Sequence, residues 1–121
     1  MLILTFALVL LAGQLPADAP TPPIPALKAR LGPCSADFSV TDADGAPVFG
    51  ATVHVRVRYG AFSVKRADLE VDTDSRGLAR IEGLPAKAKP LAFDIQKDGK
   101  KATAEQNVSD TCQATHAITL K

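Results

Sequence analysis

The stretch 38–57, FSVTDADGAPVFGATVHVRV, limits what this chain can fold into more than any other part of it. Phe38 and Val40 alternate with polar residues, and Val53, Val55 and Val57 resume the alternation after a break. Such a period of two places apolar side chains on one face of a strand and polar ones on the other. The break is rich in Asp, Gly and Pro, which favour turns. The stretch therefore predicts two half-buried strands joined by a turn.

Further short segments of the same kind follow at regular spacing, and Asp98-Gly99 is a strong signal for a two-residue hairpin turn. Beyond the first 13 residues the chain shows no helical period. These features predict an all-β, seven-stranded, two-sheet sandwich of Greek-key type. We expect its strands at about 35–41, 51–59, 67–73, 78–81, 91–96, 101–108 and 112–120.

The chain of 121 residues is long enough for one domain. Residues 1–13 are almost wholly apolar, and we interpret 1–19 as a secretory signal peptide. No Lys or Arg precedes the apolar run, so a retained weak anchor and a buried helix stay open as alternatives. Residues 20–30 are rich in Pro and predict an extended linker, and 31–121 form the sandwich domain. The predicted location is secreted or periplasmic.

Cys34 and Cys112 are the only cysteines. Because they lie far apart in the sequence, they do not form a CxxC redox or zinc motif. In an exported chain two such thiols are expected to pair as a disulfide. The alternative is two unrelated thiols buried in the core.

The charge balance argues against a nucleic acid partner, and the length of the apolar run argues against an integral membrane span. A net charge of +1 gives no basic footprint for nucleic acid. The run of 13 residues is shorter than the roughly 20 that an integral membrane span requires. We therefore predict no nucleic acid partner and no integral span.

Alternating charges on two neighbouring predicted strands suggest a cross-strand ladder. Its members are His54, Arg56 and Arg58 on one strand and Asp68, Glu70 and Asp72 on the next. One register of the hairpin puts Arg58 beside Asp68, Arg56 beside Glu70 and His54 beside Asp72. The ladder is either a solvated set of pairs that fixes the register or a ligand site. Lys87 and Lys89 lie in a basic loop, which is either solvated or faces an anionic partner.

Two motifs resemble a known family. They are V-T-D-x-D-G-x-P-V-x-G-A-T-V at 40–53 and T-D-S-x-G-x-A-x-I-x-G-L-P at 73–85. Together they resemble the carboxypeptidase regulatory-like domain, one of the transthyretin-like sandwiches, and also the collagen-binding-protein B repeats. The resemblance implies an immunoglobulin-like, extracytoplasmic module without catalytic activity, and the motifs themselves shape turns and strand ends.

The functional residues of two enzyme families of related fold can be searched for in this sequence. Hydroxyisourate hydrolases end in Tyr-Arg-Gly-Ser, whereas this chain ends in Thr119-Leu120-Lys121. Intradiol dioxygenases hold iron with two Tyr and two His, whereas this chain has Tyr59, His54 and His116. No three or four residues converge as metal ligands in the sequence pattern.

We therefore predict a protein that is not an enzyme and has no cofactor, metal or catalytic residues. It would be an exported module with a structural, adhesion or carbohydrate- or protein-binding role at the cell envelope. Its partner would be an unknown protein or envelope component, and it would be a monomer or a weak edge-strand oligomer. The alternative is a small transthyretin-fold hydrolase or metal-binding enzyme with an unrecognised loop site.

Overall fold

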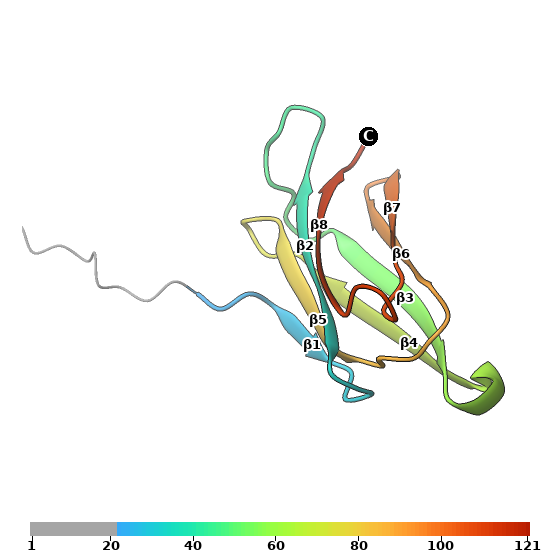
Figure 1. Ribbon diagram of the computed structural model, residues 1–121. Coiled ribbons are helices and arrows are strands. Elements are labelled where there is room, and N and C mark those ends of the chain that lie inside the picture. Colours follow the sequence, from blue (N-terminus) through green and yellow to red (C-terminus); the bar gives the residue numbers. More distant parts are fainter. Residues whose placement is uncertain (1–21) are drawn as a thin grey trace, which may run out of the picture.

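The computed structural model describes residues 22–121 and consists of two four-stranded sheets packed face to face (Figure 1). The first, called the β2 sheet, has the strand order β1-β5-β2-β8. Its strands are β1 (Ala26–Lys28), β5 (Leu78–Leu84), β2 (Cys34–Thr41) and β8 (Gln113–Thr119). The second, the β3 sheet, has the order β4-β3-β6-β7. Its strands are β4 (Lys65–Asp72), β3 (Thr52–Tyr59), β6 (Leu91–Lys97) and β7 (Lys100–Gln106).

Two of the connections are hairpins, the link from β1 to β2 stays within the β2 sheet, and the other connections cross from one sheet to the other. The β3–β4 and β6–β7 hairpins are antiparallel and lie in the β3 sheet. In the β2 sheet, β2 pairs antiparallel with β5 and parallel with β8. The predicted all-β sandwich is confirmed, with eight strands in the described part of the chain instead of seven.

The additional strand β1 comes from the segment 20–30, which the sequence led us to treat as a linker. Ala26, Leu27 and Lys28 pair in parallel with β5, and the Ala29 amide donates a hydrogen bond to Glu82 O at 2.8 Å. The strand covers an edge of the β2 sheet that would otherwise expose unpaired backbone groups. The predicted signal peptide, 1–19, lies outside the described residues.

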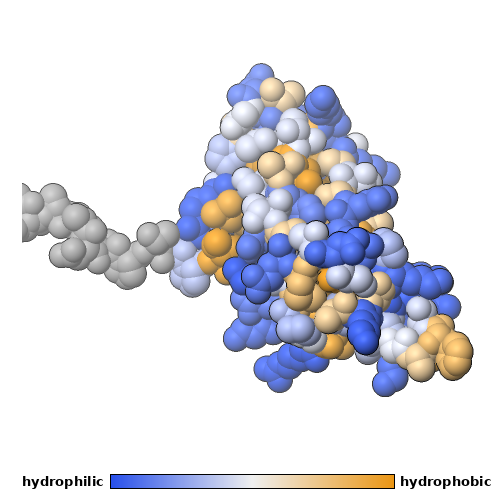
Figure 2. All heavy atoms as spheres, in the orientation of Figure 1, coloured by the Kyte–Doolittle hydropathy of each residue, from blue (hydrophilic) through white to orange (hydrophobic). Residues whose placement is uncertain are grey.

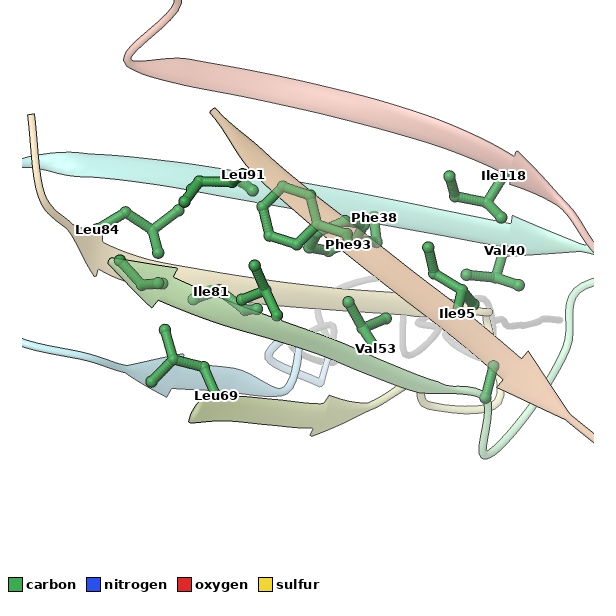
Figure 3. Packing of buried hydrophobic residues seen from close by; sticks show 14 of the residues in the cluster. Phe38, Val40, Val53, Leu69, Ile81, Leu84, Leu91, Phe93, Ile95 and Ile118 are labelled. Atoms are coloured by element: carbon green, nitrogen blue, oxygen red, sulfur yellow. The ribbon is translucent and has the colours of Figure 1, made fainter. Parts of the chain in front are cut away.

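The core fills the space between the sheets with the apolar faces of the alternating strands (Figure 3). Phe38 of β2 and Phe93 of β6 meet edge to face at its centre, with ring centroids 4.9 Å apart. Val53, Val55 and Val57 of β3 are fully buried, as the alternation predicted. Burying side chains of this size contributes roughly 1.5–3 kcal/mol each. The sandwich is therefore held mainly by these inward-facing rows.

A disulfide joins Cys34, the first residue of β2, to Cys112, which directly precedes β8. Their Cα atoms are 4.6 Å apart, and the Ser35 amide donates a hydrogen bond to Cys112 O. Buried Gln106 supports the same corner, because its side-chain amide donates to Ser35 O and Thr111 O. The bridge thus ties the parallel β2–β8 pair at its start.

Between residues 22 and 121 we find no helix of the length and apolarity that crossing a bilayer requires.

Candidate functional site

The outer face of the β3 sheet carries a group of ionisable side chains that the strand register brings together. Alternation forces this arrangement, because each inward Val on β3 turns the next side chain outward. The strand register aligns one row of four outward residues across the whole sheet: Glu70 on β4, His54 on β3, Asp94 on β6 and Thr103 on β7. His54 therefore lies near the middle of an open, polar surface.

The six residues of the predicted charge ladder lie on the neighbouring strands β3 and β4, in a register that differs by two residues from the one considered above. Arg56 lies opposite Asp68, His54 opposite Glu70 and Thr52 opposite Asp72. Arg58 lies opposite Arg66, so it has no acidic partner across the strand. The difference arises in the connection, which is shorter than the expected loop 60–66. A 3-10 turn, η3 (Ala61–Ser63), closes the hairpin and lets β4 start at Lys65.

His54, Arg56 and Asp68 form a contacting trio on this face. Arg56 Nε donates a hydrogen bond to Asp68 Oδ1 at 3.0 Å, and His54 Nε2 lies 3.6 Å from the same oxygen. The hydrogen bond from Arg56 is the main cause that lowers the pKa of Asp68, with the charges of Arg56 and His54 acting in the same direction. Asp68 therefore stays ionised, and its carboxylate lies beside the imidazole on one side.

A shallow groove of about 500 Å³ runs along the other side of His54. Its lining is cationic along one wall and contains one carboxylate: His54, Arg56, Arg58, Lys89, Pro90, Ala92 and Asp94. Asp94 and Lys89 were not among the ladder residues. The alternation places Asp94 on the outward face of its strand, and Lys89 belongs to the basic loop. Only the strand register and the path of the loop place these two residues beside His54.

Neither His116 nor Tyr59 lines this groove. The His116 ring packs against Phe38 and Phe93 at centroid distances of 5.3 and 5.4 Å, and its Nε2 is 3.1 Å from Gln106 Oε1. Burial lowers the pKa of His116. Tyr59 ends β3 and forms an isolated bridge with Ala88. His116 is thus a partly buried residue that packs between the sheets, while His54 faces outward.

No family model matches the chain, and no curated protein matches it. Solved structures of similar fold are ring-cleaving dioxygenases. Catechol 1,2-dioxygenase from Acinetobacter sp. ADP1 gives a TM-score of 0.54 at 12% identity, over 80% of this chain and 58% of that one. The enzyme from Pseudomonas arvilla C-1 gives 0.56 at 14%, over 79% and 57%. Hydroxyquinol 1,2-dioxygenase from Pseudomonas putida DLL-E4 gives 0.52 at 13%, over 78% and 58%.

These comparisons correct the family prediction. The chain spans less than two thirds of the length of these dioxygenases, and at such identities the likeness concerns the fold. The neighbours are nevertheless enzymes with an intradiol dioxygenase fold and not carboxypeptidase regulatory-like or transthyretin-like domains. The expectation of a non-catalytic module, and the statement that the chain is not an enzyme, are overturned with the family. The two motifs at 40–53 and 73–85 describe turns, and turns recur in many sandwiches.

The residues of this chain do not fit the iron that intradiol dioxygenases hold. Only Tyr59, His54 and His116 are of the required kinds. His54 lies on the outer face of the β3 sheet, whereas His116 belongs to the β2 sheet and packs between the sheets. Among residues 22–121, no three His, Cys, Asp or Glu side chains gather closely enough to hold a metal ion. We therefore derive the chemistry of the groove from its own side chains.

Proposed function

We propose that this chain is a small hydrolase whose site is the groove beside His54 and whose substrates carry a negative charge. The observation that carries the proposal is the position of His54, with Asp68 at 3.6 Å on one side and the cationic groove on the other. The enzymatic fold neighbours support an enzyme, and the donor set supports proton transfer in place of iron chemistry.

The substrate would be held by its charge. Arg58 and Lys89 line the groove, both are exposed, and Arg58 faces Arg66 across the hairpin instead of an acid. A carboxylate or phosphate group bound in the groove between Arg58 and Lys89 would supply the negative charge that Arg58 lacks across the hairpin. The single carboxylate of the groove, Asp94, would disfavour a substrate whose second end is also anionic.

His54 would act as general base on a water molecule. The imidazole removes a proton as the water oxygen attacks the carbonyl carbon of an ester or lactone, and the guanidinium group of Arg56 stabilises the oxyanion. Asp68 balances the imidazolium that forms, in the manner of a carboxylate behind a catalytic histidine. When the tetrahedral intermediate collapses, the carbon–oxygen bond to the leaving alcohol breaks, and the imidazolium returns its proton to that oxygen.

A matched panel of esters and lactones tests the proposal. We expect turnover of carboxylate-bearing members at least tenfold above that of their neutral analogues, because the groove is cationic. His54→Gln should abolish this turnover, and Asp68→Asn should lower kcat about tenfold or more, since general base catalysis contributes about 10²–10⁴-fold. Glu105→Gln, on the same face but outside the groove, is the control. Wild-type rates that equal background, or that survive His54→Gln, would refute the proposal.

We further infer that the protein is secreted or periplasmic and works as a monomer or weak edge-strand oligomer. The disulfide is compatible with an oxidising compartment. The intact mass of the exported protein tests the location, because a cleaved leader and a two-proton deficit restored by reductant are both expected. An intact N-terminus with two free thiols would contradict it. Light scattering measures the assembly state directly.

A further inference from the structure

The tip of the β3–β4 hairpin exposes large apolar side chains to solvent. Phe62 is 97% exposed and Val64 is 71% exposed, and both lie at or beside the turn η3. The hairpin carries this turn away from the body of the sandwich (Figure 1). In the space-filling view an apolar tip stands at the same place, with hydrophilic side chains behind it (Figure 2). Burial in the fold therefore does not explain the choice of these residues.

The backbone at this tip is also unusual for the residues that occupy it. Phe62 and Ser63 have positive φ values of 60° and 55°, and Gly60, two residues before Phe62, has a φ of 82°. Gly, Asn and Asp adopt the left-handed region most readily, and bulky side chains there are uncommon. A phenylalanine that bears this cost and faces water is consistent with a partner that offers it an apolar environment.

Basic side chains surround the apolar tip. Arg58, Lys65 and Arg66 lie on the two strands next to the turn, and Lys87 and Lys89 lie on the neighbouring loop. The Tyr59–Ala88 bridge holds that loop against the end of β3. All five side chains are exposed, and the ion pairs within residues 22–121 involve other residues. We call these five residues the basic cluster.

We propose that the hairpin tip docks on a bilayer that contains anionic phospholipid, with Phe62 and Val64 inserted among the headgroups and the basic cluster above them. Two weak signals, an apolar insertion and a polybasic patch, together give the reversible binding that neither gives alone. The tip is convex and narrow, which suits insertion between lipids. The neighbouring cations match the anionic headgroups, whereas a second copy of this chain would bring five like charges into the contact.

Vesicle co-sedimentation of the full chain tests the proposal. Its readout is the partition coefficient on neutral phosphatidylcholine vesicles and on vesicles that also contain 30% phosphatidylglycerol. We expect at least tenfold tighter binding to the anionic vesicles, weakening as salt is added. The apolar segment 1–13 is common to all variants, so differences between variants report on the hairpin tip.

Two pairs of matched variants locate the contact. Phe62→Ser should weaken anionic binding about tenfold or more, whereas Phe49→Ser should change it less than twofold. Phe49 is also exposed, but it precedes β3 while Phe62 follows it, so the two lie about 25 Å apart or more along an eight-residue strand. Arg66→Glu should weaken binding more than tenfold, at about fivefold per charge. Lys100→Glu, at the end near Phe49, should have a far smaller effect.

Equal binding to both kinds of vesicle, or no response to Phe62→Ser in a variant whose urea midpoint is unchanged, would overturn the proposal. So would a dimer in light scattering that Phe62→Ser dissolves, because the tip would then serve a second copy. His54→Gln should leave vesicle binding unchanged. The bilayer proposal therefore stands or falls separately from the proposed hydrolase.

Discussion

Breaking the disulfide should remove a large part of the stability of this sandwich. Cys34 and Cys112 lie 78 positions apart, so the bridge closes a loop that includes most of the described strands. In the chain-entropy model, closing a loop of this length stabilises the folded state by roughly 4 kcal/mol. Small domains have total stabilities of about 5–15 kcal/mol. We therefore expect the reduced protein to be folded only marginally.

Urea unfolding of the wild type, with and without reductant, measures this loss. For a domain of about a hundred residues, 4 kcal/mol corresponds to a fall in Tm of roughly 15–30 °C. The Cys34→Ala/Cys112→Ala variant should resemble the reduced wild type and should not respond to reductant, which separates the cross-link from other effects of the reagent. A difference below about 1 kcal/mol between oxidised and reduced wild type would refute the reasoning. It would mean that the β2–β8 pairing alone holds this corner.

Three further perturbations test local arguments. In urea unfolding, Gly77→Ala should destabilise the fold by about 2 kcal/mol or more, because the added Cβ would meet the backbone of β2. Gly45 is also at positive φ but has open space around it, so Gly45→Ala should cost about 1 kcal/mol in the same assay. Burial lowers the pKa of His116, so on acidification the unfolded chain binds a proton at this histidine before the folded chain does. The free energy of unfolding should therefore fall as the pH drops below about 6.5. His116→Leu should remove that part of the pH dependence of the urea midpoint. Thr73→Val should cost about 1–3 kcal/mol in thermal unfolding, because buried Thr73 Oγ1 accepts a hydrogen bond from the Ala51 amide.

Most of the fold could be predicted from the sequence because the alternation of apolar and polar residues is a local property. Every predicted strand overlaps an observed one, and even the weakly alternating β7 is paired, with small inward residues such as Ala102 and Ala104. The strand β1 was not predicted because three residues within a Pro-rich segment carry no periodic signal. They form a strand only by pairing with the edge of β5. The family prediction was wrong because it rested on turn motifs, which encode backbone geometry and carry no chemistry.

The candidate site was predictable only in part, for a related reason. Alternation placed His54, Arg56 and Arg58 on one face, but their partners depend on the register of the hairpin. That register is set by Phe62 and Ser63, whose left-handed backbone shortens the connection, and nothing in their residue types announces it. The groove adds Lys89 and Asp94 from elements distant in the chain. Long-range placement of this kind follows from sheet order, which the alternation pattern does not contain.

The two proposals share cations, and this overlap makes a combined behaviour testable. Arg58 and Lys89 line the groove and also belong to the basic cluster behind the hairpin tip. Docking on an anionic bilayer would therefore bring headgroups close to the cationic wall of the groove, and anionic lipid should compete with a water-soluble anionic substrate. Lys89→Glu should weaken both substrate turnover and vesicle binding, whereas Phe62→Ser should weaken vesicle binding alone and His54→Gln turnover alone. If Lys89→Glu changed neither, the cations at this end would be solvated charges, and both proposals would lose the electrostatic argument on which they rest.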